Sequence, residues 1–203
     1  MTELSDTYKS IKAPSEGFFK DRGSKFYAFA FPVSSEEEVK EHQDSLRKSH
    51  HDARHHVYAF LLGADESVFR ASDDGEPAHS SGDPVLGQIR SYGLTNILIV
   101  VIRYFGGTKL GIPGLINAYK TAAAMALENA DIVEHVRRKY FRIKFDYPLM
   151  DQINRLIREE NLKVSDRIFE MDCEMELGVR LRDVDRISQR LKQAPEVKIL
   201  NIK

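Results

Sequence analysis

The sequence contains little of what a disulfide-bonded, zinc-thiolate or membrane-spanning protein requires. Its one cysteine, Cys173, has no second cysteine for a disulfide or a thiolate zinc site, and we expect it to be a small buried apolar residue. The longest apolar run, Ile97 to Ile102, is far shorter than the roughly 20 residues that a transmembrane helix needs. The first ten residues lack the apolar core of a signal peptide. We therefore expect a cytoplasmic protein that does not associate with membranes.

The chain also has no excess of charge of either sign. Its 30 basic and 31 acidic side chains give a net charge of −1, which argues against strong, sequence-independent binding to nucleic acid. The charge is uneven, because residues 1–136 carry 14 basic and 19 acidic side chains whereas residues 137–203 carry 16 and 12. A length of 203 residues is enough for two small domains. We expect them to span residues 1–135 and 136–203.

The first 135 residues predict a mixed domain of helices and strands. The run from Thr95 to Tyr104 is apolar and rich in β-branched residues, which is typical of a central strand buried on both faces. Ser35 and Glu38 form a capping box that predicts a helix ending near Ser49. The other expected elements are an extended segment at 8–11, a hairpin within 18–31, strands near 56–62 and 68–69, and helices over 84–92 and 113–129.

The last 67 residues have a regular pattern of elements. We expect strands over 136–147, 162–169, 171–180 and 197–202, and helices over 149–160 and 184–192. The order is βαββαβ, which is the ferredoxin-like pattern. The sequence thus predicts an α+β protein of two domains, an N-terminal α/β sandwich and a C-terminal ferredoxin-like domain.

Four histidines lie close together in the sequence. His50 and His51 are expected at the end of a helix, whereas His55 and His56 point to opposite faces of a strand. Four metal ligands cannot converge from that local geometry, so we predict no metal site. A polar hydrogen-bond network is the favoured interpretation of these residues.

The segment SDDGEP, residues 72–77, allows two interpretations. Asp73 and Asp74 can accept backbone N–H groups in a tight turn, with Gly75 at positive φ. Alternatively, Asp73, Asp74 and Glu76 form a carboxylate set for general-base catalysis or for a cation. The sequence favours neither strongly.

The segment RYFGGTKLG, residues 103–111, also has a structural and a functional interpretation. A buried strand ends in two aromatic residues, a glycine pair lets the backbone approach another group closely, and Lys109 precedes a helix N-terminus. These features favour a phosphate, carboxylate or RNA site, although the spacing is not that of a P-loop. A tight turn with a salt-bridged Arg103 explains the same residues.

These two segments, with ARHHVYAF at 53–60 and the run from Gly82 to Gly111, resemble the YigZ/IMPACT family. The resemblance covers nearly the whole chain and implies an N-terminal domain similar to domain IV of elongation factor G. It also implies a C-terminal ferredoxin-like domain similar to domain V of that factor. Such folds contact RNA on the ribosome, and eukaryotic members of the family regulate translation with a different second domain.

The resemblance identifies ten candidate positions for binding a ligand or nucleic acid, and none that we assign to catalysis. They are His55, Asp73, Asp74, Glu76, Arg103, Tyr104, Gly106, Gly107, Lys109 and Gly111. The sequence departs from the family's common pattern in two places. His79 replaces a small residue and Asp83 a basic one, and after Gly111 a glycine pair is replaced by Pro113-Gly114 and an arginine by Asn117. We expect no metal and no cofactor.

The favoured hypothesis is a nonenzymatic, translation-associated regulatory protein that binds RNA or the ribosome through the segment from Arg103 to Gly111 and part of the C-terminal sheet. The first alternative is a small-molecule hydrolase or phosphotransferase that uses both signature segments. That alternative requires the two segments to converge on one cavity. The second alternative is a protein-binding regulator that uses the acidic helix from Glu36 to Asp44.

Overall fold

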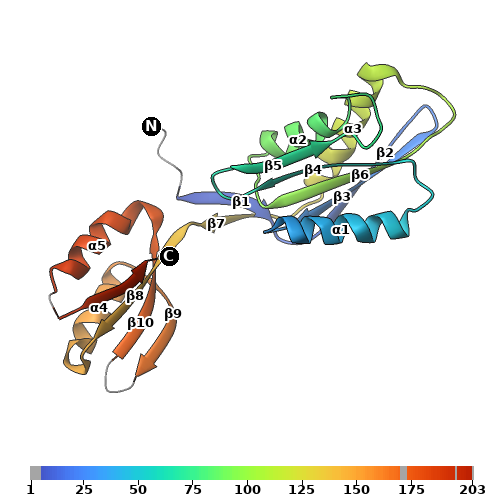
Figure 1. Ribbon diagram of the computed structural model, residues 1–203. Coiled ribbons are helices and arrows are strands. Elements are labelled where there is room, and N and C mark those ends of the chain that lie inside the picture. The colour runs from blue at the N-terminus through green and yellow to red at the C-terminus, as the bar shows by residue number, and fades with distance from the viewer. Residues whose placement is uncertain (1–5, 170–172, 195, 203) are drawn as a thin grey trace. The chain divides into compact units, whose positions relative to one another are not determined.

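The computed structural model describes residues 6–169, 173–194 and 196–202, and the chain folds into two compact units. The N-terminal unit comprises Tyr8–His135 (Figure 1). The C-terminal unit begins at Val136 and includes Asp6 and Thr7. No helix in the described part of the chain is both long and apolar enough to cross a membrane.

A five-stranded antiparallel sheet forms the centre of the N-terminal unit. Its strand order is β2-β3-β6-β4-β5. The prediction of a central buried strand is confirmed, since β6 is the middle strand and its residues from Ile97 to Arg103 are buried. The strand bounds are Ser15–Asp21 for β2, Ser24–Pro32 for β3, His55–Leu62 for β4, Val68–Ser72 for β5 and Ile97–Tyr104 for β6.

Helices cover both faces of this sheet (Figure 1). α2 (Gly82–Ser91) and α3 (Gly111–Glu128) share a core with the inward residues of one face, whereas α1 (Glu36–Ser49) packs on the other. Small residues let α3 approach β2 closely: a Cβ on Gly17 would lie 2.4 Å from the backbone nitrogen of Ala126. The approach explains why this helix buries alanines where other helices bury larger side chains.

The extended segment expected at 8–11 forms a strand, but its partner strand was not predicted. β1 (Thr7–Ile11) pairs with β7 (Ile132–Val136) in a separate two-stranded sheet. The sequence indicated a single strand from residue 136 to 147, but the structure ends β7 at Val136 and begins β8 (Arg138–Phe145) two residues later. The alternating pattern continues through this break, so periodicity alone does not reveal it.

The C-terminal unit has the predicted ferredoxin-like fold. After β8 come α4 (Met150–Glu159), β9 (Lys163–Phe169), β10 (Cys173–Arg180), α5 (Val184–Lys192) and β11 (Lys198–Ile202), with short 3₁₀ turns at Tyr147–Leu149 and Leu181–Asp183. The sheet is antiparallel with the order β11-β8-β10-β9. Cys173 is free and fully buried, as expected. Residues 171 and 172 of the predicted strand over 171–180 lie outside the described residues.

Candidate functional site

The two signature segments meet through a buried ion pair. Arg103 is near the end of β6, and Glu76 is in the loop between β5 and α2. The Arg103 Nη1 atom lies 2.6 Å from Oε1 of Glu76, and both side chains are about 95% buried, with exposures of 6% and 5%. The Tyr119 hydroxyl on α3 donates to the same oxygen at 2.7 Å. The structure therefore contains the salt-bridged Arg103 that the structural interpretation of residues 103–111 required.

Arg103 points inward because of its register in the sheet. It pairs across the sheet with Phe26 on β3 and His55 on β4. Its guanidinium carbon lies 5.5 Å from the ring centroid of Phe26 and 5.6 Å from that of Phe105. Nη2 donates a long bond of 3.4 Å to the Ser24 hydroxyl. Nε is buried and has no partner among the described residues.

Tyr119 remains a neutral donor in this cluster. Its burial, together with the negative charge of Glu76, raises the pKa of the phenol well above its ordinary value, and the charge of Arg103 only partly opposes this. The phenol therefore keeps its proton and continues to donate to Glu76. One carboxylate oxygen thus receives both a guanidinium and a hydroxyl donor.

Asp73 binds the start of α2 to the preceding loop. Its carboxylate accepts the backbone N–H groups of His79, Ser81 and Gly82 at 2.8, 3.0 and 2.8 Å, and the Ser81 hydroxyl at 2.6 Å. Partial burial raises the pKa of Asp73, but these hydrogen bonds outweigh it and hold the pKa below its ordinary value. The contacts match the tight-turn interpretation of this segment.

Asp74 is also engaged within the fold. Its carboxylate accepts the backbone N–H of His56 at 2.6 Å and an N–H of Arg47 at 3.0 Å. Burial opposes the effect of these bonds, yet they keep the pKa of Asp74 below its ordinary value. The Asp74 carbonyl lies 2.8 Å from Nδ1 of His55. Because a carbonyl only accepts, Nδ1 of His55 carries a proton, and Nε2 faces Oε1 of Glu76 at 4.0 Å.

The loop after β6 lies directly against the turn between β2 and β3. A Cβ on Gly106 would lie 1.9 Å from the carbonyl carbon of Gly23, so no other residue fits without separating the two backbones. The Gly106 N–H donates to the Ser24 hydroxyl at 3.2 Å. Gly107 has a φ of +88°, and both Phe105 and Lys109 are exposed. The loop is thereby held at a fixed place beside the hairpin.

Both signature segments line one cavity of about 450 Å³, which we call the signature cavity. Five of the ten candidate residues line it: His55, Glu76, Arg103, Lys109 and Gly111. The lining also includes Arg54 and Phe105, which lie within the family-like segments without being candidate positions, and Ile112 and Leu115, which lie outside them. The remaining candidates, which are Asp73, Asp74, Tyr104, Gly106 and Gly107, lie outside its lining.

Tyr104 belongs to a second cavity, of about 540 Å³, whose lining includes Lys25, Tyr27 and Phe105. The Tyr104 hydroxyl donates to Asp52 at 3.1 Å and lies 2.9 Å from Nδ1 of His50. Burial and the nearby Asp52 carboxylate raise the pKa of Tyr104, which keeps the phenol protonated. His50 therefore takes part in a polar network, as its sequence context indicated.

The remaining polar side chains to be placed are His56, His79 and Asp83. Burial lowers the pKa of His56, which favours its neutral form. His79 and Asp83 form an exposed pair, with Nδ1 2.6 Å from Oδ2, so the two unusual residues contact each other. Hydrogen bonding to Asp83 raises the pKa of His79. Within residues 6–169, 173–194 and 196–202, no three His, Cys, Asp or Glu side chains are grouped in a way that could hold a metal ion.

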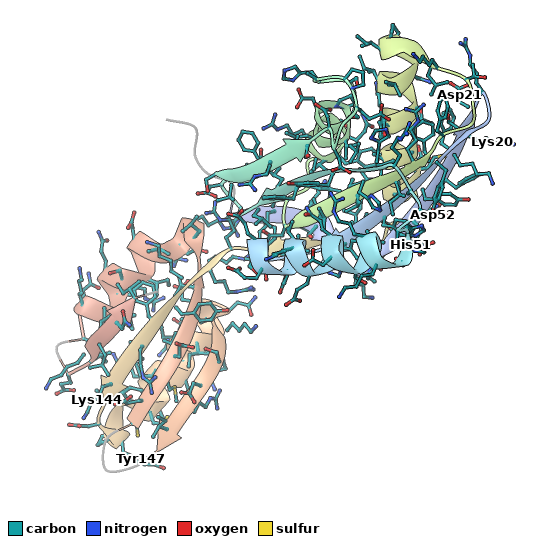
Figure 2. All side chains as sticks on the ribbon, turned by 45° about the vertical axis from the view of Figure 1, so that its right-hand side comes forward. Lys20, Asp21, His51, Asp52, Lys144 and Tyr147 are labelled. Atoms are coloured by element: carbon teal, nitrogen blue, oxygen red, sulfur yellow. The ribbon has the colours of Figure 1, made fainter. Side chains whose placement is uncertain are left out.

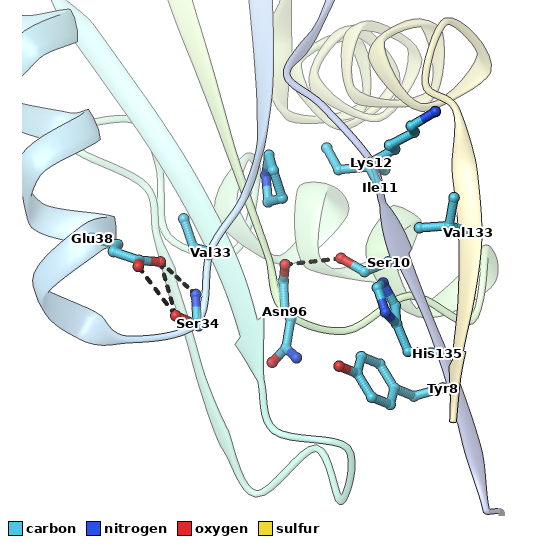
Figure 3. A pocket seen from close by; sticks show the side chains of 11 residues that line it. Tyr8, Ser10, Ile11, Lys12, Val33, Ser34, Glu38, Asn96, Val133 and His135 are labelled. Atoms are coloured by element: carbon cyan, nitrogen blue, oxygen red, sulfur yellow. Dashed lines mark hydrogen bonds between the residues drawn. The ribbon is translucent and has the colours of Figure 1, made fainter. Parts of the chain in front are cut away.

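A further cavity of about 360 Å³ lies away from the signature residues (Figure 3). The rings of Tyr8 and His135 stack there with a centroid distance of 4.9 Å. Ser10 donates to the carbonyl of Asn96 at 3.1 Å, and Glu38 accepts from Ser34 on the opposite side (Figure 3). These bonds connect secondary-structure elements and do not involve the candidate positions.

The N-terminal unit contains an antiparallel sheet whose loops carry the two signature segments, and the C-terminal unit is ferredoxin-like. The chain is thus an α+β protein of two units. Comparison with known families agrees with this architecture. The Impact N-terminal domain matches residues 22–127, and a domain of unknown function, DUF1949, matches residues 143–194. The chain belongs to the IMPACT family.

Individual relatives share this organisation over most of their length. IMPACT family member YvyE of Bacillus subtilis is 29% identical over 90% of this chain and 84% of its own. IMPACT family member YigZ of Escherichia coli is 33% identical over 70% of each chain. A crystal structure described as that of a hypothetical protein is 27% identical and covers 98% of this chain and 99% of its own, with a TM-score of 0.72.

Proposed function

We propose that this protein is a translation-associated regulatory protein without catalytic activity, and that it binds RNA or the ribosome through one end of its N-terminal unit. The link to translation comes from the family resemblance, which implies folds that contact ribosomal RNA. The observation that supports the binding surface is a group of exposed cationic and aromatic side chains around the β2–β3 turn and the loop after β6.

We call this surface the cationic–aromatic end. Lys20 and Lys25 face each other across the hairpin, and Lys25 pairs in turn with Tyr104 on β6. Figure 2 shows Lys20 at the end of the hairpin. The surface consists of the exposed residues Phe18, Lys20, Arg22, Lys25, Arg54, Phe105 and Lys109.

The cations of this surface are not neutralised by ion pairs. In the part of the chain that the structure describes, Lys20, Arg22, Lys25, Arg54 and Lys109 form no salt bridge. Two acidic residues lie nearby: Asp21 is in the hairpin, and Asp52 accepts a hydrogen bond from Tyr104. A local excess of positive charge therefore exists on a chain whose net charge is −1.

The aromatic residues supply a second kind of contact with single-stranded RNA. Phe18 is 44% exposed and Phe105 is 49% exposed. Phe18 packs on Tyr27 with ring centroids 4.9 Å apart, and Tyr27 packs edge-on to Tyr104 at 5.9 Å. Exposed rings among unpaired cations are typical of single-strand binding surfaces, where bases stack and phosphates meet basic side chains.

The C-terminal sheet has a different electrostatic character. Arg142 on β8 lies 3.0 Å from Glu174 and 3.7 Å from Asp166. Glu174 and Glu176 on β10 pair across the sheet with Lys144 and Arg142 on β8, so these two cations near the centre of the sheet lie beside carboxylates. For this reason we assign the RNA contact to the N-terminal unit, and not to the C-terminal sheet that the sequence-based hypothesis included.

The contacts of the acidic residues support a noncatalytic role. Asp73 and Asp74 are ionised and surrounded by donors, and Glu76 already accepts from Arg103 and Tyr119. Asp73 and Asp74, whose pKa values are lowered, are weak general bases, and Oε1 of Glu76 is already engaged by two donors. The convergence of both segments on the signature cavity favours the alternative of a hydrolase or phosphotransferase. Turnover of a phosphate ester that Glu76→Gln abolishes would establish that alternative.

Cosedimentation with ribosomes and isolated subunits at graded salt tests the proposal. We expect salt-sensitive binding of the wild-type protein that is lost in Lys20→Glu/Lys25→Glu, a pair outside the signature cavity. The matched control is Lys40→Glu/Lys120→Glu, which makes the same change in net charge at exposed positions on α1 and α3. Equal loss in both variants, or no comigration at any salt concentration, would contradict the proposal and leave the enzyme and the protein-binding regulator that uses α1.

A further inference from the structure

The signature cavity combines anion donors at its rim with an apolar wall. Arg54 and Lys109 are exposed cations that form no ion pair among the described residues. The 18-residue helix α3 begins at Gly111 in the same lining, with no acidic residue in its first turn and no side-chain cap at Leu110. Pro113 has no N–H, so the N–H groups of Gly111 and Ile112 remain available to an anion, and the helix dipole favours one.

A second, independent feature also indicates a ligand. Arg103 is only 5% exposed and lines the cavity, and its Nε has no partner in the part of the chain that the structure describes. A buried N–H without an acceptor is costly, and such groups are rare in folded proteins. Nε is closed off from the cavity as the side chain stands, so an acceptor on a bound molecule reaches it only with a small shift of Arg103.

The apolar wall restricts what the ligand can be. Ile112 is 53% exposed and Phe105 is 49% exposed, and together with Leu115 they give the cavity a surface for a ring. Inorganic phosphate alone would not cover this apolar surface, which would stay exposed to water. A fatty acid would place methylene groups over the polar pair of Glu76 and Arg103.

The floor of the cavity is polar but nearly neutral. The charge of Glu76 is compensated by Arg103, and Nε2 of His55 lies 4.0 Å from the same carboxylate. These groups can exchange hydrogen bonds with hydroxyl groups or with the edge of a base. A volume of about 450 Å³ is within the range of small-molecule sites.

We infer that the signature cavity binds a nucleoside monophosphate, either free or as the phosphorylated terminus of an RNA chain. The phosphate lies near Arg54, Lys109 and the start of α3, and the nucleoside lies against Phe105 and Ile112 with its polar groups toward Glu76 and Arg103. This cavity shares Arg54, Phe105 and Lys109 with the cationic–aromatic end, but the inference does not rest on the proposed function, because it requires neither Lys20 nor Lys25.

Calorimetric titration of the full chain with AMP, adenosine and inorganic phosphate tests the inference. We expect AMP to saturate one site, and adenosine and phosphate each to bind at least about tenfold more weakly, because each lacks one half of the contacts. Arg54→Glu and Lys109→Glu should each weaken AMP binding by about tenfold. Both residues are exposed, so the variants are expected to fold.

Lys120→Glu is the matched control, since it makes the same charge change on α3 at an exposed residue outside the cavity. Its affinity for AMP should equal that of the wild type. Three results would overturn the inference: no saturable AMP binding up to about 10 mM, phosphate affinity equal to that of AMP, or an unchanged affinity in Lys109→Glu.

Short oligoribonucleotides with a 5′-phosphate or a 5′-hydroxyl distinguish the two sources of the ligand. Tighter binding of the 5′-phosphorylated strand than of both the 5′-hydroxyl strand and AMP, with the difference between the strands lost in Lys109→Glu, assigns the cavity to RNA termini. Equal or tighter binding of AMP assigns it to free nucleotides. Equal binding of both strands without any AMP binding would overturn the cavity inference and leave the cationic–aromatic end in place.

Discussion

The Glu76 carboxylate connects the loop between β5 and α2 with β6 and α3. Its side chain is 5% exposed, and it holds Arg103 of β6 and the hydroxyl of Tyr119 on α3. Replacing Glu76 by Ala leaves a buried guanidinium without its counter-charge and a buried phenol without its acceptor. We predict that Glu76→Ala lowers the free energy of unfolding by roughly 3–5 kcal/mol, measured by urea denaturation.

An exposed ion pair provides the comparison for this variant. Arg155 and Glu159 form an i,i+4 pair on α4 at 2.7 Å, and the Arg155 side chain is 76% exposed. Arg155→Ala should change stability by less than about 1 kcal/mol. If the two substitutions had similar small effects, the buried pair would not hold the signature segments together.

Asp73 makes the stability of the N-terminal unit depend on pH. Its pKa is lower in the folded chain than in the unfolded chain, because hydrogen bonds at the start of α2 outweigh the effect of burial. The ionised form thus stabilises the fold above the ordinary carboxyl pKa of about 3.9, and this contribution is lost as the pH falls through the lower folded value.

Urea unfolding at a series of pH values between about 5 and 3 measures this effect. We predict that wild-type stability falls over this range and that Asp73→Asn falls less steeply, because asparagine does not titrate. Asp74 contributes in the same direction and remains in the variant. Parallel curves for the two proteins would show that Asp73 is not held ionised by the fold.

At the scale of single elements, α1 begins as its sequence predicts. The Ser35 hydroxyl accepts the N–H of Glu38 at 3.3 Å, and the Glu38 carboxylate accepts the N–H of Ser34 at 2.6 Å. We predict that Ser35→Ala lowers the free energy of unfolding by about 1 kcal/mol in thermal or urea denaturation. Ser45→Ala, at an exposed position within the same helix, should leave stability nearly unchanged. An equal loss of unfolding free energy in Ser35→Ala and Ser45→Ala would argue against a specific cap at Ser35.

Elements with strong local signals could be predicted from the sequence. The apolar run in β6, the cap of α1 and the βαββαβ order are confirmed, because period and capping depend on neighbouring residues. α2 begins at Gly82, two residues before the predicted start at Pro84. The carboxylate that binds its first N–H groups belongs to Asp73, nine positions earlier, and no local pattern shows such a contact.

The candidate site could be predicted only as two separate segments. Glu76 and Arg103 are 27 positions apart, and their contact depends on the placement of β6 between β3 and β4. The same tertiary arrangement brings Phe105 and Arg54 to the signature cavity. Both residues lie within the family-like segments, but local sequence does not show that their side chains line the same cavity.

At the scale of the whole molecule, a net charge of −1 conceals local differences. Five cations that form no salt bridge among the described residues lie at the cationic–aromatic end, whereas Arg142 on the C-terminal sheet has acidic partners. The proposed function therefore requires RNA binding through a few phosphate contacts, with an affinity that depends moderately on salt. The slope of that dependence reports how many contacts are made.

The most direct test of the RNA-binding surface is therefore an anisotropy titration with single-stranded RNA at several salt concentrations. The account predicts that the logarithm of the binding constant falls linearly with the logarithm of salt concentration. In Lys20→Ala/Lys25→Ala the slope should be shallower by about 1.4, which is about 0.7 for each phosphate contact removed. Identical slopes for wild type and variant, or binding that salt does not weaken, would contradict it.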